Sequence, residues 1–238
     1  MSSRGPTKSA KPEGDSAAPS SRKRILLVDD HPMMRAGLAQ LINKQPDLEV
    51  CGEAGNPSEA FNELSRFQPD LILADITMPG RSGIEFIKDL LASYPKLRIL
   101  VVSMHDEMIY AERALRAGAR GYIMKEAGGE SLLAAIRDVL SEKVYVSSKT
   151  SAKILNAMTG QKPRGSSSPI EKLSDREFEI FQLIGQGKST RDIAEQLHLS
   201  PKTVDVHRSH IKEKLELTDV TSLVRHAVRW VETLHAGQ

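Results

Sequence analysis

Five short apolar runs, with segments of helical spacing between and after them, limit the folds open to this chain more than any other feature. Turn-forming residues bound each run, as is typical of strands buried on both faces of a parallel sheet. In the first intervening segment, Met34, Leu38 and Leu41 lie on one helix face. Because a crossover between parallel strands holds a helix, the alternation predicts an α/β doubly wound, five-stranded parallel sheet. The expected strands are residues 25–28, 48–51, 71–74, 99–102 and 121–124, and the expected helices are 31–45, 57–67, 82–94, 107–117 and 129–142.

The sequence divides into four parts. Residues 1–23 are rich in Ser, Pro, Lys and Gly and are expected to form a disordered tail, because they cannot bury enough apolar surface to offset the entropy of ordering. The predicted sheet occupies residues 24–146. Gly, Pro and Ser mark residues 147–170 as a linker, with a short helix expected at 151–158. Residues 171–238 have helical patterns only, which predicts a second, all-α domain.

Composition excludes several classes of protein. No apolar run approaches the roughly 20 residues that span a bilayer, and no apolar core of a signal peptide follows the basic N-terminal segment. The single cysteine, Cys51, excludes an internal disulfide framework and a multi-cysteine zinc site. We therefore expect a cytoplasmic protein without a membrane segment, in which Cys51 packs as a small apolar residue.

Chemically active residues follow four of the predicted strands. Asp29 and Asp30 follow the first strand, Asp75 the third, Ser103 the fourth and Lys125 the fifth. Ligands of open α/β sheets bind outside the carboxyl ends of the strands, so we expect these side chains to converge. Three carboxylates at one edge repel each other unless a cation is present, and Mg²⁺ prefers oxygen ligands. A lysine and a hydroxyl beside them complete a predicted site for Mg²⁺ and a phosphoryl group.

In the order and strand-end position of these residues, residues 24–146 resemble the flavodoxin-like receiver domain of bacterial two-component response regulators. The resemblance implies that Asp75 is the phospho-acceptor and that it attacks the phosphohistidine of a sensor histidine kinase. It also implies that Asp30, Asp75 and the backbone carbonyl of Thr77 bind Mg²⁺ directly, and that Asp29 acts mainly through water.

The same resemblance assigns the conformational switch of the family to Ser103 and Tyr122. The hydroxyl of Ser103 is expected to move toward the new phosphate, and the ring of Tyr122 to rotate inward. A haloacid-type aspartyl phosphatase also uses an Asp nucleophile after a strand. That alternative is disfavoured, because it needs a second acid where this chain has Thr77.

The C-terminal segment carries the pattern of a helix-turn-helix. Ser174 and Glu177 form a capping box, and the following helix is expected to end near Gly185. Two further helices, 189–197 and 201–215, are separated by a tight turn, and the second of such a pair enters the major groove of DNA. The domain as a whole is slightly acidic, but basic residues exceed acidic ones along the second helix.

The run from Ser200 to Arg208 is the most specific part of a resemblance to the LuxR-type helix-turn-helix, which covers residues 173–217. The alternative for this segment is a small helical domain that binds protein and not DNA. By the resemblance, base edges are contacted by Asp205, Val206 and Ser209, and phosphates by Lys202, Thr203, His207, Arg208 and Lys212.

His207 and His210 have the i, i+3 spacing that can hold a metal ion. The sequence places no third ligand near them. DNA contact or solvation is therefore the preferred interpretation.

A receiver followed by a LuxR-type domain resembles the NarL/FixJ branch of response regulators. We expect a phosphorylation-controlled transcription factor, not an enzyme, whose partners are a sensor histidine kinase and double-stranded DNA. An alternative is a phosphotransfer or phosphatase protein whose C-terminal domain binds only protein. A phosphate-independent regulator is disfavoured, because the full set of acidic, hydroxyl and lysine residues is present.

The last predicted helix, 220–234, has a wide apolar surface. Val220, Val224, Ala227, Val231 and Leu234 form one stripe, and Leu223 and Trp230 an adjacent one. Because this surface exceeds what one short domain should need for its own core, we expect a homodimer on DNA with inverted half-sites. Without phosphorylation, we expect the receiver to cover or misorient this surface.

Overall fold

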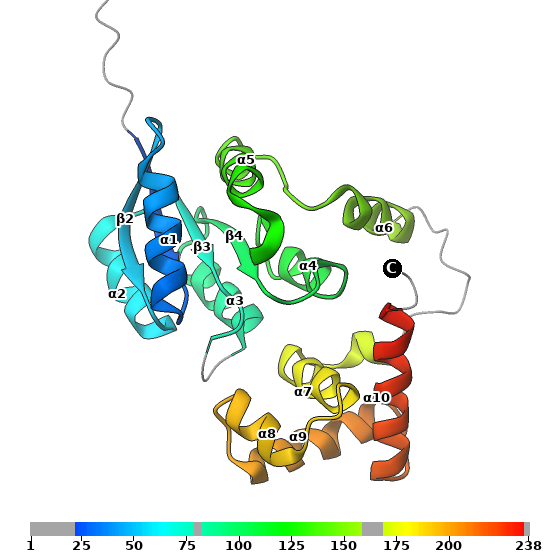
Figure 1. The fold of residues 1–238 in the computed structure, drawn as a ribbon. Helices are drawn as coiled ribbons and strands as arrows, with labels where there is room; N and C mark the ends of the chain where they lie inside the picture. Colours follow the sequence, from blue (N-terminus) through cyan, green and yellow to red (C-terminus); the bar gives the residue numbers. More distant parts are fainter. Residues whose placement is uncertain (1–21, 79–81, 159–168, 236–238) are drawn as a thin grey trace, which may run out of the picture.

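The computed structural model describes residues 22–78, 82–158 and 169–235. Figure 1 shows two folded parts, one coloured blue to green and one coloured yellow to red. The tail expected at residues 1–23 falls almost entirely outside the described residues. Its last residue, Lys23, already begins the first strand and pairs with Leu48, so the expected boundary lies one residue too late.

The first part contains the predicted parallel sheet. Its strand order is β2-β1-β3-β4-β5, and every pairing between neighbours is parallel. This confirms the doubly wound α/β fold. The strands are β1 (Lys23–Val28), β2 (Leu48–Ala54), β3 (Leu71–Ala74), β4 (Arg98–Ser103) and β5 (Gly121–Met124).

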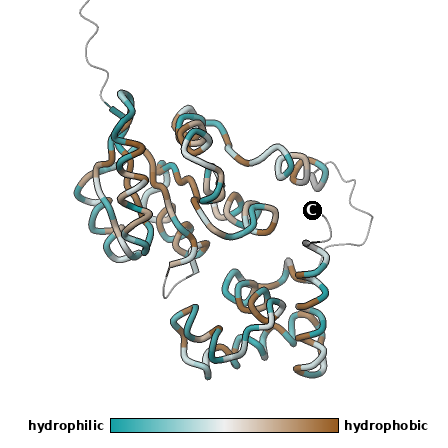
Figure 2. Tube along the Cα trace, in the orientation of Figure 1, coloured by the Kyte–Doolittle hydropathy of each residue, from teal (hydrophilic) through white to brown (hydrophobic). Residues whose placement is uncertain are grey.

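Alternating side chains of the strands face two layers of helices. Ile25 and Leu27 pack on the side of α1 and α5, whereas Leu26 and Val28 pack on the side of α2, α3 and α4. Brown in Figure 2 marks hydrophobic residues, which dominate the central strands, and most residues of the first, third and fourth strands are buried on both faces of the sheet. The helices are α1 (Pro32–Asn43), α2 (Pro57–Phe67), α3 (Gly83–Ser93), α4 (Glu107–Arg116) and α5 (Gly129–Leu140), with a 3₁₀ turn, η1 (Lys125–Ala127), after β5.

The second part is helical, as predicted, and its helices begin at polar caps. Ser174 and Glu177 form the expected capping box, Ser189 and Asp192 form a second one, and the Ser200 side chain accepts a hydrogen bond from the Thr203 amide. The elements are η2 (Pro169–Lys172), α7 (Asp175–Gly185), α8 (Thr190–Gln196), α9 (Pro201–Lys214) and α10 (Val220–His235).

In the sequence, α6 (Ser148–Met158) connects the two parts, and it begins three residues before the expected short helix. The Ser147 hydroxyl accepts a hydrogen bond from the Thr150 amide and caps this helix. The apolar pattern alone could not show that start.

No helix in the described ranges is long and apolar enough to cross a membrane.

A test of the packing uses Gly83, the first residue of α3. A β-carbon at this position would lie 2.2 Å from the α-carbon of Ile76, in the segment that follows β3. We expect Gly83→Ala to lower the free energy of unfolding by about 1–3 kcal/mol, because backbone must move. Gly37→Ala is the matched control in α1, where a β-carbon meets no atom within 4 Å, and it should not destabilise. Urea denaturation measures both, and equal stabilities would contradict this packing.

Candidate functional site

The expected acidic residues meet at one edge of the sheet. Asp29 follows β1 and Asp75 follows β3, two strands that are paired side by side. The Asp75 amide donates a hydrogen bond of 2.8 Å to the Val28 carbonyl, which holds the two strand ends together. Asp29 and Asp75 are only 3% and 2% exposed. Carboxylate oxygens of Asp29, Asp30 and Asp75 and a ring nitrogen of His31 lie within 4.8 Å of one another.

Lys125 lies between two of these carboxylates. Its ammonium nitrogen is 2.6 Å from Asp29 Oδ2 and 2.7 Å from Asp75 Oδ2. Burial opposes the charge of this ammonium, but the hydrogen bonds to Asp29 and Asp75 outweigh burial and raise the pKa of Lys125. The lysine therefore keeps its charge and offsets the repulsion between two buried carboxylates.

The oxygen atoms of Asp30 and Thr77 suit a hard divalent cation. Asp30 Oδ1 is buried without a hydrogen-bond partner; it lies 2.7 Å from His31 Nδ1, but not in hydrogen-bond geometry. The Thr77 hydroxyl is also buried and unpartnered, and the Thr77 amide donates a hydrogen bond to Asp75 Oδ1 at 2.8 Å. Unsatisfied oxygens beside Asp75 fit Mg²⁺, which prefers oxygen ligands.

The expected switch residues are connected through His105. Ser103 is fully buried, and its hydroxyl accepts a hydrogen bond from the His105 amide at 3.1 Å. The Tyr122 hydroxyl donates to the His105 carbonyl at 2.8 Å, so this ring already points inward. Burial raises the pKa of Tyr122 and lowers that of His105, so both side chains are neutral at pH 7.

From His105 the contacts continue into the second part of the chain. The His105 ring stacks on Tyr110 of α4, with centroids 4.6 Å apart. The Tyr110 hydroxyl donates to Gln182 Oε1 of α7 at 2.5 Å, and its ring meets Phe178 edge-on. A continuous series of contacts thus runs from the end of β4 to α7. Sequence reasoning missed His105 and Tyr110, because nothing local distinguishes a histidine that follows a strand.

Charged residues close this interface around Asp175, at the start of α7. Its carboxylate is 2.7 Å from the Lys88 ammonium of α3 and 3.1 Å from the Arg113 guanidinium of α4. Arg113 also lies over the Phe178 ring, 4.0 Å from its centroid. Ser82 donates a hydrogen bond of 2.8 Å to Glu179, whose pKa is raised by burial. Because both sides of α7 are covered, every residue from Asp175 to Ile184 is buried.

The receiver therefore covers α7, and it leaves part of α10 exposed. Val220 and Val224 are 49% and 37% exposed, whereas Leu223 and Ala227 are buried. Trp230 packs on Phe178 and Phe181. The sequence predicts that part of the apolar surface of α10 serves a partner. Val220 and Val224 remain accessible for that role, whereas Ala227 completes the core of its own domain. The burial of Leu234 lies outside the description.

On α9, the predicted DNA contacts lie on accessible positions. Val204 and Ile211 are buried and anchor the helix, whereas Val206 is 46% exposed. Arg208 donates a hydrogen bond to the Thr190 hydroxyl at 2.5 Å and so ties α9 to α8. Lys202, Asp205, Val206 and Ser209 are exposed, and Thr203, His207, Arg208 and Lys212 are partly exposed.

Comparison with known sequences assigns both parts. Residues 25–137 match the response regulator receiver domain, and residues 171–227 match the bacterial regulatory proteins of the luxR family. Oxygen regulatory protein NreC of Staphylococcus carnosus (strain TM300) is 37% identical over 210 residues, which cover 87% of this chain and 97% of that protein. NreC of Staphylococcus aureus (strain MRSA252) is 38% identical with the same coverage.

Comparison with solved structures finds response regulators as well. A LuxR-family two-component response regulator from Aurantimonas sp. SI85-9A1 has a TM-score of 0.54 and 34% identity, and the match covers 58% of this chain and 99% of that one. RcsB of Salmonella enterica serovar Typhimurium, bound to promoter rprA with phosphomimetic BeF₃⁻, has a TM-score of 0.59 and 22% identity; that match covers 87% and 98%. The chain thus belongs to the NarL family of response regulators, transcription factors in which a receiver domain precedes a LuxR-type DNA-binding domain.

Proposed function

We propose that Asp75 accepts a phosphoryl group from a phosphohistidine of a sensor histidine kinase in the cytoplasm. A carboxylate oxygen of Asp75 attacks phosphorus, the P–N bond breaks, and the departing imidazole takes up a proton. The position of Lys125 carries this proposal, because its ammonium lies 2.7 Å from the nucleophile and can pair with a phosphoryl oxygen. The receiver would extend over residues 24–146 and the DNA-binding domain over 171–238, joined by the linker 147–170.

Mg²⁺ would be held by Asp30, Asp75 and the Thr77 carbonyl, with Asp29 acting through water. When bound, the ion neutralises the charge of the phosphoryl oxygens. The buried oxygen of Asp30 without a hydrogen-bond partner supports this assignment. Asp29 already pairs with Lys125, which fits its less direct role.

Phosphorylation would act on DNA binding through Ser103 and Tyr122. If the Ser103 hydroxyl turns toward a phosphoryl oxygen, it ceases to accept from the His105 amide. His105 stacks on Tyr110, and Tyr110 bonds to Gln182 of α7, so the change reaches the domain interface. A local change of charge would in this way bias a two-state packing of the two domains.

The DNA-binding form would be a homodimer that reads inverted half-sites with α9. Asp205, Val206 and Ser209 would face base edges, and this is supported by their exposure. The phosphate contacts would come from Lys202, Thr203, His207, Arg208 and Lys212. The exposed end of α10 at Val220 and Val224 offers the apolar surface for a second copy.

The acceptor is tested by Asp75→Asn. With acetyl phosphate and Mg²⁺, the native chain should gain one phosphoryl group in intact-mass spectra, and the variant or a chelated sample should gain none. Asp47→Asn is the matched control, because Asp47 is an exposed carboxylate paired with Arg137. An undiminished adduct in Asp75→Asn would show that another residue accepts the phosphate.

The switch is tested by Ser103→Ala, which keeps the nucleophile and Lys125. We expect phosphate incorporation close to native, but a smaller gain in DNA affinity on phosphorylation. Lys125→Ala should reduce both, because the buried carboxylates lose their cation. Fluorescence anisotropy on labelled DNA measures the gain. A native gain in Ser103→Ala would contradict the proposed route through His105.

The dimer is tested by Val224→Lys. Placing a charge on the exposed part of α10 should weaken dimerisation of the phosphorylated chain on DNA about 10-fold or more, a cost of about 1.4 kcal/mol. Val144→Lys is the control, because it places the same charge at an exposed valine (55%) in the receiver. Sedimentation velocity measures the dimer.

The arrangement of the half-sites is tested separately. Inserting about 5 bp between half-sites should abolish cooperative binding, and spacing-independent binding would refute the inverted arrangement.

A further inference from the structure

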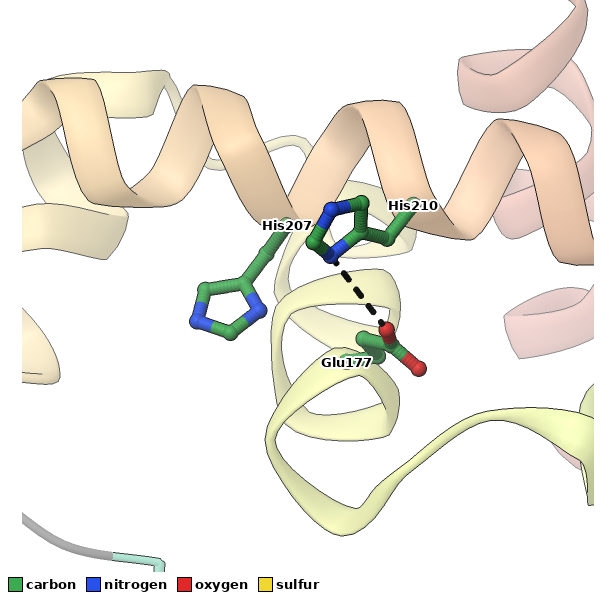
Figure 3. A group of neighbouring side chains, drawn as sticks. All are labelled: Glu177, His207 and His210. Atoms are coloured by element: carbon green, nitrogen blue, oxygen red, sulfur yellow. Dashed lines mark ion pairs between the residues drawn. The ribbon is translucent and has the colours of Figure 1, made fainter.

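The fold brings a third metal-binding side chain to the two histidines of α9. Glu177 of α7 places a carboxylate oxygen 3.9 Å from His210 Nδ1. Donor atoms of Glu177, His207 and His210 all lie within 4.8 Å of one another. Figure 3 shows both imidazole rings leaving α9 on the side of α7, with the Glu177 carboxylate next to His210. Sequence spacing could not show this group, because Glu177 lies 30 residues before His207.

In two of the three side chains, Glu177 and His207, an atom that can ligate a metal is not occupied by a hydrogen bond. His207 Nδ1 is buried and has no hydrogen-bond partner, although buried polar atoms are usually paired. Glu177 is ionised: burial opposes its charge, but the Lys214 ammonium and the Ser174 amide more than compensate and lower its pKa. Both of these partners bind Oε2, at 2.6 and 2.8 Å, which leaves Oε1 toward the histidines.

The environment also favours the neutral imidazole that binds metals. Burial lowers the pKa of His207, with the Glu177 carboxylate acting in the opposite direction. The Glu177 side chain is 5% exposed and the His210 side chain 53% exposed. The group is therefore walled by α7 on one side and open to solvent on the other.

We propose that Glu177, His207 and His210 form a binding site for Zn²⁺ or a divalent ion of similar ligand preference. Two imidazoles and one carboxylate are a donor set that zinc accepts, with a water in the fourth position. Mg²⁺ and Ca²⁺ prefer sets made only of oxygens, so this site differs in kind from the carboxylate edge of the receiver. Donors on one tetrahedral zinc lie about 3.3 Å apart, given bond lengths of about 2.0–2.1 Å. The donor atoms lie within 4.8 Å of one another in the present structure, so a bound ion would draw them closer together.

The site has a structural consequence for the DNA-binding domain. His207 and His210 belong to α9, which carries the proposed DNA contacts, and Glu177 belongs to α7, which packs against the receiver. A bound ion would cross-link these two helices. It would also engage His207, which is otherwise proposed to contact a phosphate. The metal site goes beyond that proposed function and does not depend on it.

The test uses Co²⁺ as a spectroscopic substitute for zinc on the tag-free, full-length chain, in excess Mg²⁺ to occupy the receiver carboxylates. We expect the visible bands of a four-coordinate cobalt site to saturate at one ion per chain. Zn²⁺ should displace the cobalt and remove the bands. The absence of a saturable four-coordinate spectrum would overturn the proposal.

Three variants locate the ion. His210→Ala and Glu177→Gln should each weaken cobalt binding by at least about 10-fold, because each removes a ligand. Glu177→Gln keeps a side-chain oxygen for the Ser174 amide, so the helix cap is retained. His198→Asn is the matched control; it removes an exposed imidazole of the same domain at a positive φ of 51°, which Asn tolerates.

Thermal unfolding and circular dichroism of each variant establish that it is folded before its affinity is compared. If His210→Ala fails this check, Glu177→Gln carries the test alone. Native affinity in the folded ligand variants would place the ion elsewhere in the chain and overturn the site. Equal weakening by His198→Asn would do the same.

Discussion

The buried ion pairs of Lys125 with Asp29 and Asp75 are the interaction on which the receiver end of the sheet depends. Two carboxylates that are nearly inaccessible to water repel each other, and the ammonium between them offsets that repulsion. Removing one partner from such a group costs about 3–5 kcal/mol, because an uncompensated charge stays buried. The same lysine presents its charge to Asp75, the proposed phospho-acceptor, so a group that stabilises the fold would also form part of the proposed site.

The second constraint is the burial of α7 on all sides. One side of this helix completes the core of the helical domain through Phe181 and Ile184, and the other meets the receiver. Asp175 and Glu179 are buried acidic residues, and each has partners in the receiver. Because these contacts are polar, separation of the domains exposes groups that water can solvate.

The fold could be predicted from the sequence because its signals are local. Short continuous apolar runs identify strands, and caps such as Ser174 with Glu177 identify helix starts. The predicted ends of strands are wrong where pairing with another strand sets the end. β2 continues to Ala54 because Val28 of β1 pairs with Ala54, and residues 52–54 alone do not have the pattern of a strand.

The site residues divide in the same way. Asp29, Asp30, Asp75, Ser103 and Lys125 were identified from sequence because each follows a strand, and parallel strands bring their carboxyl ends to one edge. By itself, then, the sequence determined the sheet, the helical domain and the acidic edge. Only the tertiary structure decided that His105 and Tyr110 lead to Gln182, that α7 packs against the receiver, and that Glu177 joins His207 and His210. The physical reason is that these contacts depend on how separate helices dock, and docking is set by side chains far apart in the chain, beyond the reach of any local pattern.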